Sequence, residues 1–359
     1  MSWLTRTSFP AASAARGLLL LPPEGGPAVP MSAGDREAAL GLASATLAAA
    51  GVGENDRVVV ALGNDGDLTG ALLAEAASGV AQAAASVGPR GRLRLHNAIE
   101  TVGATALVTT PTGAMDFLAR LHLEFLLDPL DLELRRILLV GEIPSPGTCR
   151  QLADEFEASV RELYADPFTG TPIAQRDPDA HQVLTPVRDG LLGLAPPDKD
   201  VLLDAPYDEG LAELVVTPAW HSALGDATLR TGHAVRLEGG EEGVPAPSHT
   251  VGEHVLVRGR WLPVPRLAAA LARIDGISRW DLRISREGTL DAAALHVAFT
   301  RSTLVENPMW RSRIAQALYA LTPVSIDVVI EEEVTEERRP GTVTDLRGHH
   351  LGPDRSRLP

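Results

Sequence analysis

The residues Arg57-Val58-Val59-Val60-Ala61-Leu62 contain a short and continuous apolar run that begins at Val58. A run of this kind suits a β-strand that is buried on both faces, as strands of parallel sheets are. An alanine-rich helical pattern precedes it at residues 35–50, and a second helical pattern follows at residues 67–78. A buried strand between two helices is the unit from which doubly wound α/β sheets are built.

The same alternation of strand and helix continues to residue 163, which predicts a sheet covered on both faces. Residues 165–207 are rich in Pro, Asp and Gly, so we expect loops with isolated strands there. A second, largely β unit begins with strands at 210–217 and 233–237. Between residues 78 and 163, the alternating pattern predicts strands over 81–87, 105–109, 136–140 and 160–163 and helices over 93–102, 112–127 and 146–156.

The C-terminal third has a pattern of its own, in the order helix, strand, strand, helix, strand. This order is typical of a compact α+β domain of the split βαβ type. We predict an N-terminal domain over residues 1–252, a C-terminal lid domain over 259–348 and a flexible tail over 349–359. The five elements are expected at 262–274, 281–285, 293–299, 308–321 and 324–330.

The composition narrows the class of protein. A chain of 359 residues is long enough for about two domains, and its net charge of −15 argues against nucleic acid or an anionic membrane as a partner. Cys149 is the only cysteine, so neither an intramolecular disulfide nor a thiolate metal site can form within the chain. No apolar stretch approaches the ~20 residues of a membrane span. We therefore expect a cytoplasmic protein without a metal site.

Short segments spread along the chain carry a resemblance to a known family. Their order resembles the phenylacetate-CoA ligase-like branch of the adenylate-forming (acyl-CoA synthetase) superfamily, from about residue 9 to residue 347 and with a short N-terminus. The resemblance implies a large N-terminal α/β domain, with a doubly wound sheet and a β unit, and a small C-terminal α+β lid. The segments are Ala49-Ala50-Gly51-Val52, Asp56-Arg57-Val58, Leu68-Thr69-Gly70, Val108-Thr109-Thr110-Pro111-Thr112, Val140-Gly141-Glu142, Glu162-Leu163-Tyr164, Ala212-Glu213-Leu214-Val215, Leu229-Arg230-Thr231-Gly232 and Val257-Arg258-Gly259.

The phosphate-binding loop of such ligases has a degenerate counterpart here. The family loop is rich in Ser, Thr and Gly and ends in Gly-Lys, so that backbone N–H groups and a lysine hold the ATP phosphates. Residues 20–30 read LLPPEGGPAVP, with four prolines that remove amide donors and no hydroxyl or lysine. Lys199 is the only lysine in the chain. We expect this loop to bind phosphate poorly.

The adenine and magnesium motif, Tyr-Gly-x-Ser/Thr-Glu, corresponds to Tyr164-Ala165-Asp166-Pro167-Phe168. The resemblance implies that Tyr164 stacks on a purine, whereas Phe168 replaces the glutamate that holds magnesium. Asp166 is a candidate replacement ligand, but we favour a structural turn for it because a proline follows.

The family's Arg-Thr-Gly-Asp corresponds to Arg230-Thr231-Gly232-His233, and a histidine recognises ribose less well than an aspartate does. We favour His233 as a solvated residue at a strand start. The family hinge corresponds to Gly252-Glu253-His254 with the Arg258-Gly259 turn, and Thr342 stands where the mobile lid lysine is expected.

The acyl site of such ligases maps to the segments around Gly63, Thr69, Thr110, Gly141 and Glu142. The joint loss of the phosphate loop, magnesium glutamate, ribose aspartate and lid lysine favours a pseudoenzyme. Such a protein would bind an acyl or aryl ligand, a second copy of itself, a carrier protein or an active ligase. No catalytic residue is assigned.

Two enzymatic alternatives stay open. One is an AMP-forming aryl or acyl carboxylate-CoA ligase that uses ATP, Mg²⁺ and coenzyme A, with Arg230 and Arg258 as phosphate clamps. The other is an acyl transferase that needs no ATP. Catalysis by an unrelated nucleophile has less support, because Gly-x-Ser-x-Gly is absent.

Overall fold

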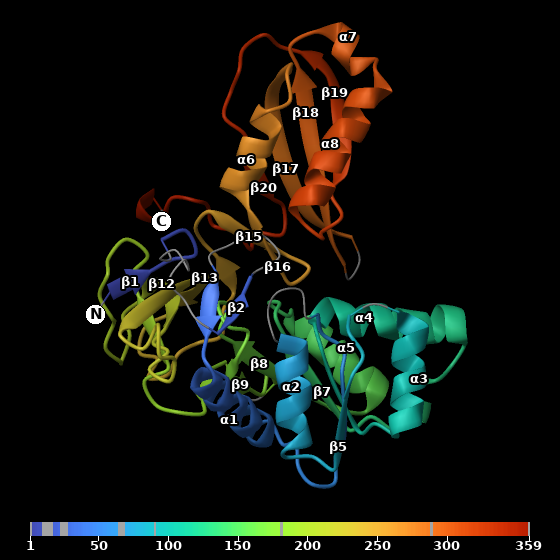
Figure 1. The fold of residues 1–359 in the computed structure, drawn as a ribbon, viewed down its shortest axis with the longest axis vertical. Helices are drawn as coiled ribbons and strands as arrows, with labels where there is room; N and C mark the ends of the chain where they lie inside the picture. The colour runs from blue at the N-terminus through green and yellow to red at the C-terminus, as the bar shows by residue number, and fades with distance from the viewer. Residues whose placement is uncertain are drawn as a thin grey trace. The chain divides into compact units, whose positions relative to one another are not determined.

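The valine run forms strand β4 (Arg57–Val60) in a computed structural model that describes residues 2–8, 17–21, 28–63, 69–89, 91–179, 182–287 and 290–357. Strand β4 belongs to a seven-stranded sheet with the order β10-β9-β8-β7-β6-β4-β5 (Figure 1). Strands β5, β6, β7 and β8 run parallel to it, β9 is antiparallel to β8, and β10 is in turn antiparallel to β9. The bounds are β5 (Ala83–Ser86), β6 (Ala106–Thr109), β7 (Arg136–Val140), β8 (Ser159–Ala165), β9 (Pro172–Arg176) and β10 (Thr185–Pro186).

Helices cover both faces of this sheet, which confirms the doubly wound prediction. Side chains alternate along a strand, so Val58 and Val60 pack on one side and Val59 packs on the other. The first face contacts α1 (Ala33–Ala49) and α2 (Thr69–Ser78). The second face contacts α3 (Arg92–Val102), α4 (Pro111–Arg120), which continues into a π-helix, η2 (Leu121–Phe125), and α5 (Pro146–Phe156).

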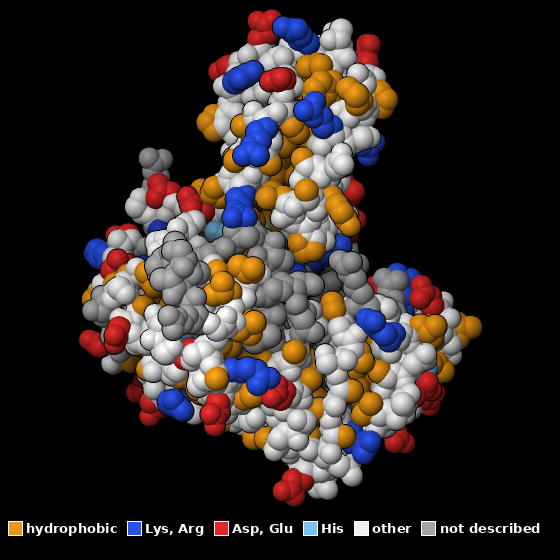
Figure 2. Space-filling view, viewed as in Figure 1, with side chains coloured by type: hydrophobic (Ala, Val, Ile, Leu, Met, Phe, Trp, Pro, Cys, Tyr) orange, Lys and Arg blue, Asp and Glu red, His pale blue; other side chains and the backbone are white. Residues whose placement is uncertain are grey.

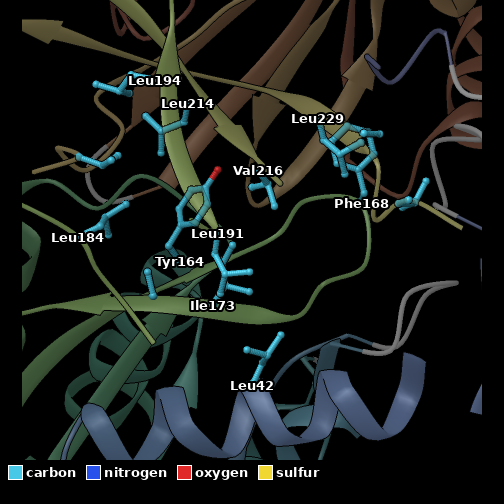
Figure 3. Packing of buried hydrophobic residues seen from close by; sticks show 14 of the residues in the cluster. Leu42, Tyr164, Phe168, Ile173, Leu184, Leu191, Leu194, Leu214, Val216 and Leu229 are labelled. Carbon is cyan, nitrogen blue, oxygen red and sulfur yellow. The ribbon is translucent and has the colours of Figure 1, made fainter. Parts of the chain in front are cut away.

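A second sheet forms the predicted β unit, with the order β1-β13-β12-β11. Strand β1 (Ser2–Leu4) pairs in parallel with β13 (Ala227–Leu237), and the other neighbours are antiparallel. Its inner face packs on Leu42, Tyr164 and Phe168 (Figure 3). The remaining strands are β11 (Leu192–Ala195), β12 (Gly210–Val216) and the pair β2 (Leu18–Leu20) and β3 (Val29–Met31).

The chain divides into two compact units, Met1–Ser248 and His249–Pro359. The second unit has a four-stranded sheet with the order β19-β18-β17-β20, and α6 and α8 share its buried core. The predicted order of helix, strand, strand, helix, strand is present, and β20 is a strand that the sequence did not predict. The elements are β14 (His249–Thr250), β15 (His254–Val257), β16 (Arg260–Pro263), α6 (Val264–Ala272), β17 (Ile277–Glu287), β18 (Leu290–Phe299), α7 (Ser302–Val305), α8 (Pro308–Leu321), β19 (Asp327–Val334) and β20 (Thr342–Asp345).

Charged side chains of both signs are scattered over the first unit. On the face shown in Figure 2, its basic side chains lie among acidic ones, and the described residues form no continuous basic surface there. Among the described helices, none is long and apolar enough to cross a membrane.

Candidate functional site

The strand order of the large sheet places a switch point between β4 and β6. The chain passes from β4 outward to β5 and then crosses back to β6 on the other side of β4. In parallel α/β sheets, ligands bind at the carboxyl ends of the strands beside such a point. Gly63 follows β4, Thr110 follows β6 and Gly141-Glu142 follows β7. The structure therefore brings these predicted acyl-site residues to one edge of the sheet.

Polar contacts join neighbouring strand ends at this edge. The Thr110 hydroxyl caps α4 by accepting the Gly113 N–H at 3.0 Å. One carboxylate oxygen of Glu142 accepts the Thr112 N–H at 2.9 Å and the Thr112 hydroxyl at 2.6 Å. A carboxylate beside the first turn of a helix also interacts favourably with the helix dipole. Glu142 thus fixes the start of α4 from the end of β7.

The start of α2 packs against the turn that follows β8. Gly170 has φ +73°, and a Cβ atom placed on it would lie 2.1 Å from the Thr69 hydroxyl oxygen. A methyl group does not fit there, and the backbone conformation itself favours glycine. Thr69 therefore lies against Gly170, two residues after the segment that corresponds to the family's adenine and magnesium motif.

Asp166 forms the structural turn that the sequence favoured. Its side chain is fully buried, and its two carboxylate oxygens accept the Phe168 N–H at 3.0 Å and the Thr169 hydroxyl at 2.8 Å. The backbone closes the same turn, because the Gly170 N–H donates to the Asp166 carbonyl at 2.7 Å. Burial raises the pKa of Asp166, while these hydrogen bonds act in the opposite direction. A metal ion would have to break this turn to use the carboxylate.

The ring of Tyr164 lies inside the β unit rather than on an open face. The side chain is 4% exposed and packs with Leu214 and Ile173 (Figure 3). Its hydroxyl is 3.2 Å from Nδ1 of His233, and the two rings meet edge to face with centroids 5.6 Å apart. In this position Tyr164 presents no exposed ring face to a purine.

The structure corrects the expectation for His233. We predicted a strand over 233–237 with a solvated histidine at its start, whereas β13 begins at Ala227 and His233 lies half-buried in its interior. Burial, and then the charge of Arg6, lower the pKa of His233 to about 3. The imidazole is therefore neutral at physiological pH.

We expect the His233 ring to stay neutral between pH 8 and pH 5, as NMR chemical shifts of the ring carbons would show. Its pKa is lowered on folding, so its contribution to stability is complete above the unfolded-state value of ~6.5. That contribution falls as the pH drops from ~6.5 toward the folded-state value. Thermal unfolding of the His233→Gln variant should accordingly depend less on acid than unfolding of the parent protein. A ring that titrates near pH 6.5 in the folded protein would contradict this.

Arg230 has several internal partners in the structure, and its assignment as a phosphate clamp stays a prediction. Its guanidinium donates to the Glu213 carboxylate at 2.8 Å and, through Nε, to Asp200 at 3.1 Å. The carbonyls of Pro196 and Lys199 accept further N–H groups, and the indole of Trp3 lies 5.0 Å from the guanidinium carbon. Glu213 is fully buried. A phosphate would have to displace these groups and separate the buried Glu213 carboxylate from the guanidinium.

Arg258 and Thr342 belong to the second unit. Arg258 has φ +49° in the turn between β15 and β16, and its Nε donates to the backbone carbonyl of Asp291. Thr342 is the first residue of β20, and its hydroxyl donates to the Asp281 carboxylate at 2.8 Å. Both side chains thus have contacts within their own unit.

The sequence did not indicate Arg6, which lies before the segments that carry the family resemblance. Its guanidinium carbon is 5.3 Å from the centroid of the Phe168 ring, and its charge acts on Tyr164, Asp166 and His233. The counterpart of the phosphate loop is described only in part, because residues 22–27 lie outside the described residues. Within the described ranges, no three His, Cys, Asp or Glu side chains form a cluster that could hold a metal ion.

A pocket of about 710 Å³ lies elsewhere in the first unit, lined by residues of β1, the first turn of α1 and the 219–227 loop. Asp35, one of two aspartates that line it, accepts the Ser32 N–H at 2.8 Å, the Ser222 N–H at 2.7 Å and the Ser222 hydroxyl at 2.8 Å. Although burial raises the pKa of Asp35, these hydrogen bonds lower it to about 2. Asp35 therefore ties α1 to the loop.

Comparison with known proteins identifies solved structures that have a similar fold. The sequence matches no protein-family model and no curated protein sequence. Solved structures are nonetheless similar. A 2-hydroxyisobutyryl-CoA ligase in complex with 2-HIB-AMP and CoA has a TM-score of 0.73 and 17% identity over 89% of this chain and 72% of its own. This chain has the fold of an adenylate-forming ligase.

Two further adenylate-forming ligase structures are similar to this chain in fold. The o-succinylbenzoate CoA synthetase MenE from Bacillus subtilis has a TM-score of 0.61 and 14% identity over 92% of this chain and 66% of its own. The amide bond synthetase McbA from Marinactinospora thermotolerans has a TM-score of 0.64 and 16% identity over 88% of this chain and 65% of its own. This chain spans less than two thirds of the length of these two ligases.

Proposed function

We propose that this chain is a degenerate phenylacetate-CoA ligase-like protein, a pseudoenzyme that binds a ligand or a partner protein without normal ATP-dependent adenylation. The observation that carries the proposal is that the motif residues Tyr164, Asp166 and Arg230 are used by internal contacts. Tyr164 is packed in a core, Asp166 closes a turn and Arg230 neutralises buried Glu213.

The chemistry of nucleotide activation supports this reading. Reactions at the phosphates of ATP depend on positioning and on charged or hydrogen-bonding groups that stabilise the transition state. The loss of one such group lowers the rate about 10²–10³-fold. The side chain at the expected magnesium ligand is Phe168, which is 4% exposed within the apolar core. Thr342 stands at the position of the lid lysine, and a hydroxyl supplies no charge.

The carboxyl edge of the sheet is the proposed ligand site. Gly63, Thr69, Thr110, Gly141 and Glu142 lie there, in a frame that the Glu142 to Thr112 contacts hold in place. We propose an acyl or aryl group as the ligand class, on the strength of the family resemblance. A partner of the chain, whether a second copy, a carrier protein or an active ligase, and a cytoplasmic location stay predictions from the sequence.

Isothermal titration calorimetry with ATP and Mg²⁺, AMP and coenzyme A tests the proposal. We expect no nucleotide binding at millimolar concentration, because the charged groups that would hold phosphate have other partners. An assay of AMP release with a panel of carboxylates should likewise give no product.

AMP formation that is lost in the Tyr164→Phe variant would contradict the proposal and support an active ligase. This variant removes only the hydroxyl that lies beside His233 and keeps the buried ring. Turnover of an acyl thioester without nucleotide would instead support the ATP-independent acyl transferase.

A further inference from the structure

The C-terminal segment of the chain returns to the first residues of the second unit. The Thr250 N–H donates to the His349 carbonyl at 2.7 Å, and the Leu351 N–H donates to the Thr250 carbonyl at 2.9 Å. Thr250 and His350 form a parallel bridge, and the Thr250 hydroxyl is 3.1 Å from Nδ1 of His350. Thr250 is 1% exposed, so these backbone groups have little access to water.

The contact continues at Gly252. Its N–H donates to the Gly352 carbonyl at 2.9 Å, and its φ of +92° is a conformation that favours glycine. A Cβ atom at this position would lie 2.8 Å from the guanidinium nitrogens of Arg355. The backbone of Gly252 is therefore enclosed by the last described residues of the chain.

Buried ion pairs anchor the returning segment. Arg347 donates to the Asp345 carboxylate through Nε at 2.9 Å and to the Leu256 carbonyl at 2.9 Å, and it also pairs with Asp291. The side chains of Arg347 and Asp345 are only 4% and 2% exposed. Asp345 additionally accepts the His350 N–H at 2.9 Å. Charge-assisted hydrogen bonds of this kind fix direction as well as distance.

We propose that residues 345–355 form a strap that holds the backbone of residues 250–252 in one conformation. The boundary between the two compact units falls between Ser248 and His249, so the strap acts on the segment that leads into the second unit. The family resemblance places the hinge at Gly252-Glu253-His254 with the Arg258-Gly259 turn. The strap therefore restrains Gly252, the first residue of that hinge, and it does so whether or not the protein binds nucleotide.

Hydrogen exchange of the full-length protein, read by mass spectrometry at single-residue resolution, tests the strap. A variant that ends at Gly348 loses the acceptors of the Thr250 and Gly252 N–H groups, and we expect both amides to exchange at least ~10-fold faster. A matched variant that ends at Arg355 keeps every strap contact named above and should exchange as the parent does. The amides of β17 and β18 report whether the unit remains folded.

A second variant guards against general unfolding. Leu351→Pro removes the Leu351 N–H, which donates to the Thr250 carbonyl, and keeps the chain length, so it should accelerate exchange at residues 250–252 alone. Unchanged exchange at Thr250 and Gly252 in both variants would overturn the proposal. So would fast exchange of these amides in the full-length protein.

Discussion

Replacement of Arg230 by alanine is expected to lower the free energy of unfolding by about 3–5 kcal/mol. Glu213 is fully buried, and Arg230 is the cation that contacts its carboxylate at 2.8 Å. Without the guanidinium, that buried carboxylate loses the positive charge that contacts it in the core. Chemical denaturation followed by tryptophan fluorescence measures the loss.

Arg236→Ala is the matched control, because Arg236 lies on the same strand and is exposed. It should change the free energy of unfolding by less than ~0.5 kcal/mol. The double variant Arg230→Met with Glu213→Leu removes both charges and should recover much of the stability. A decrease of less than ~1 kcal/mol in the free energy of unfolding of Arg230→Ala would mean that the Arg230–Glu213 ion pair does not stabilise the β unit.

Gly170→Ala is expected to destabilise the protein by roughly 2–5 kcal/mol. The φ of +73° disfavours any side chain, at a cost of about 1–2 kcal/mol, and the contact with the Thr69 hydroxyl adds about 1–3 kcal/mol of overpacking. The measurement is again the free energy of unfolding by denaturant.

Gly190→Ala separates the two contributions. Gly190 has a similar φ of +77° and no atom within 4 Å of an added Cβ, so this variant should show the conformational cost alone. Thr69→Ala combined with Gly170→Ala should recover the steric part. Equal losses in Gly170→Ala and Gly190→Ala would show that α2 does not press on the turn after β8.

Local patterns were sufficient to predict the doubly wound sheet. After Arg57, the run at β4 is apolar because both faces of the strand are buried, and helical patterns flank it. The order of elements in the second unit was predicted for the same reason. Strand β20 was missed because Thr342–Asp345 carries polar side chains, three of which bind Asp281 or Arg347. Its pairing partner, β17, is distant in sequence.

The candidate site was predicted less completely, because its residues are defined by partners that are remote in the chain. The position of Arg230 in a conserved-looking motif gives no indication that Asp200 and Glu213 will surround it. Tyr164 was assigned to a purine, but its contact with His233 depends on how the β unit packs on the large sheet. Asp166 was predicted correctly as a turn residue because its hydrogen bonds are local.

The parallel pairing of β1 with β13 has a consequence for synthesis of the protein. Ser2 pairs with Ala227, so the first strand leaves the ribosome long before its neighbour exists. At ~5–20 residues per second, that delay is roughly 10–45 s. Arg6 follows the same strand and reaches Phe168 in the folded protein. The region around Phe168 is therefore completed late, after most of the large sheet has already emerged, and a nascent chain carries an unpaired N-terminal strand until then.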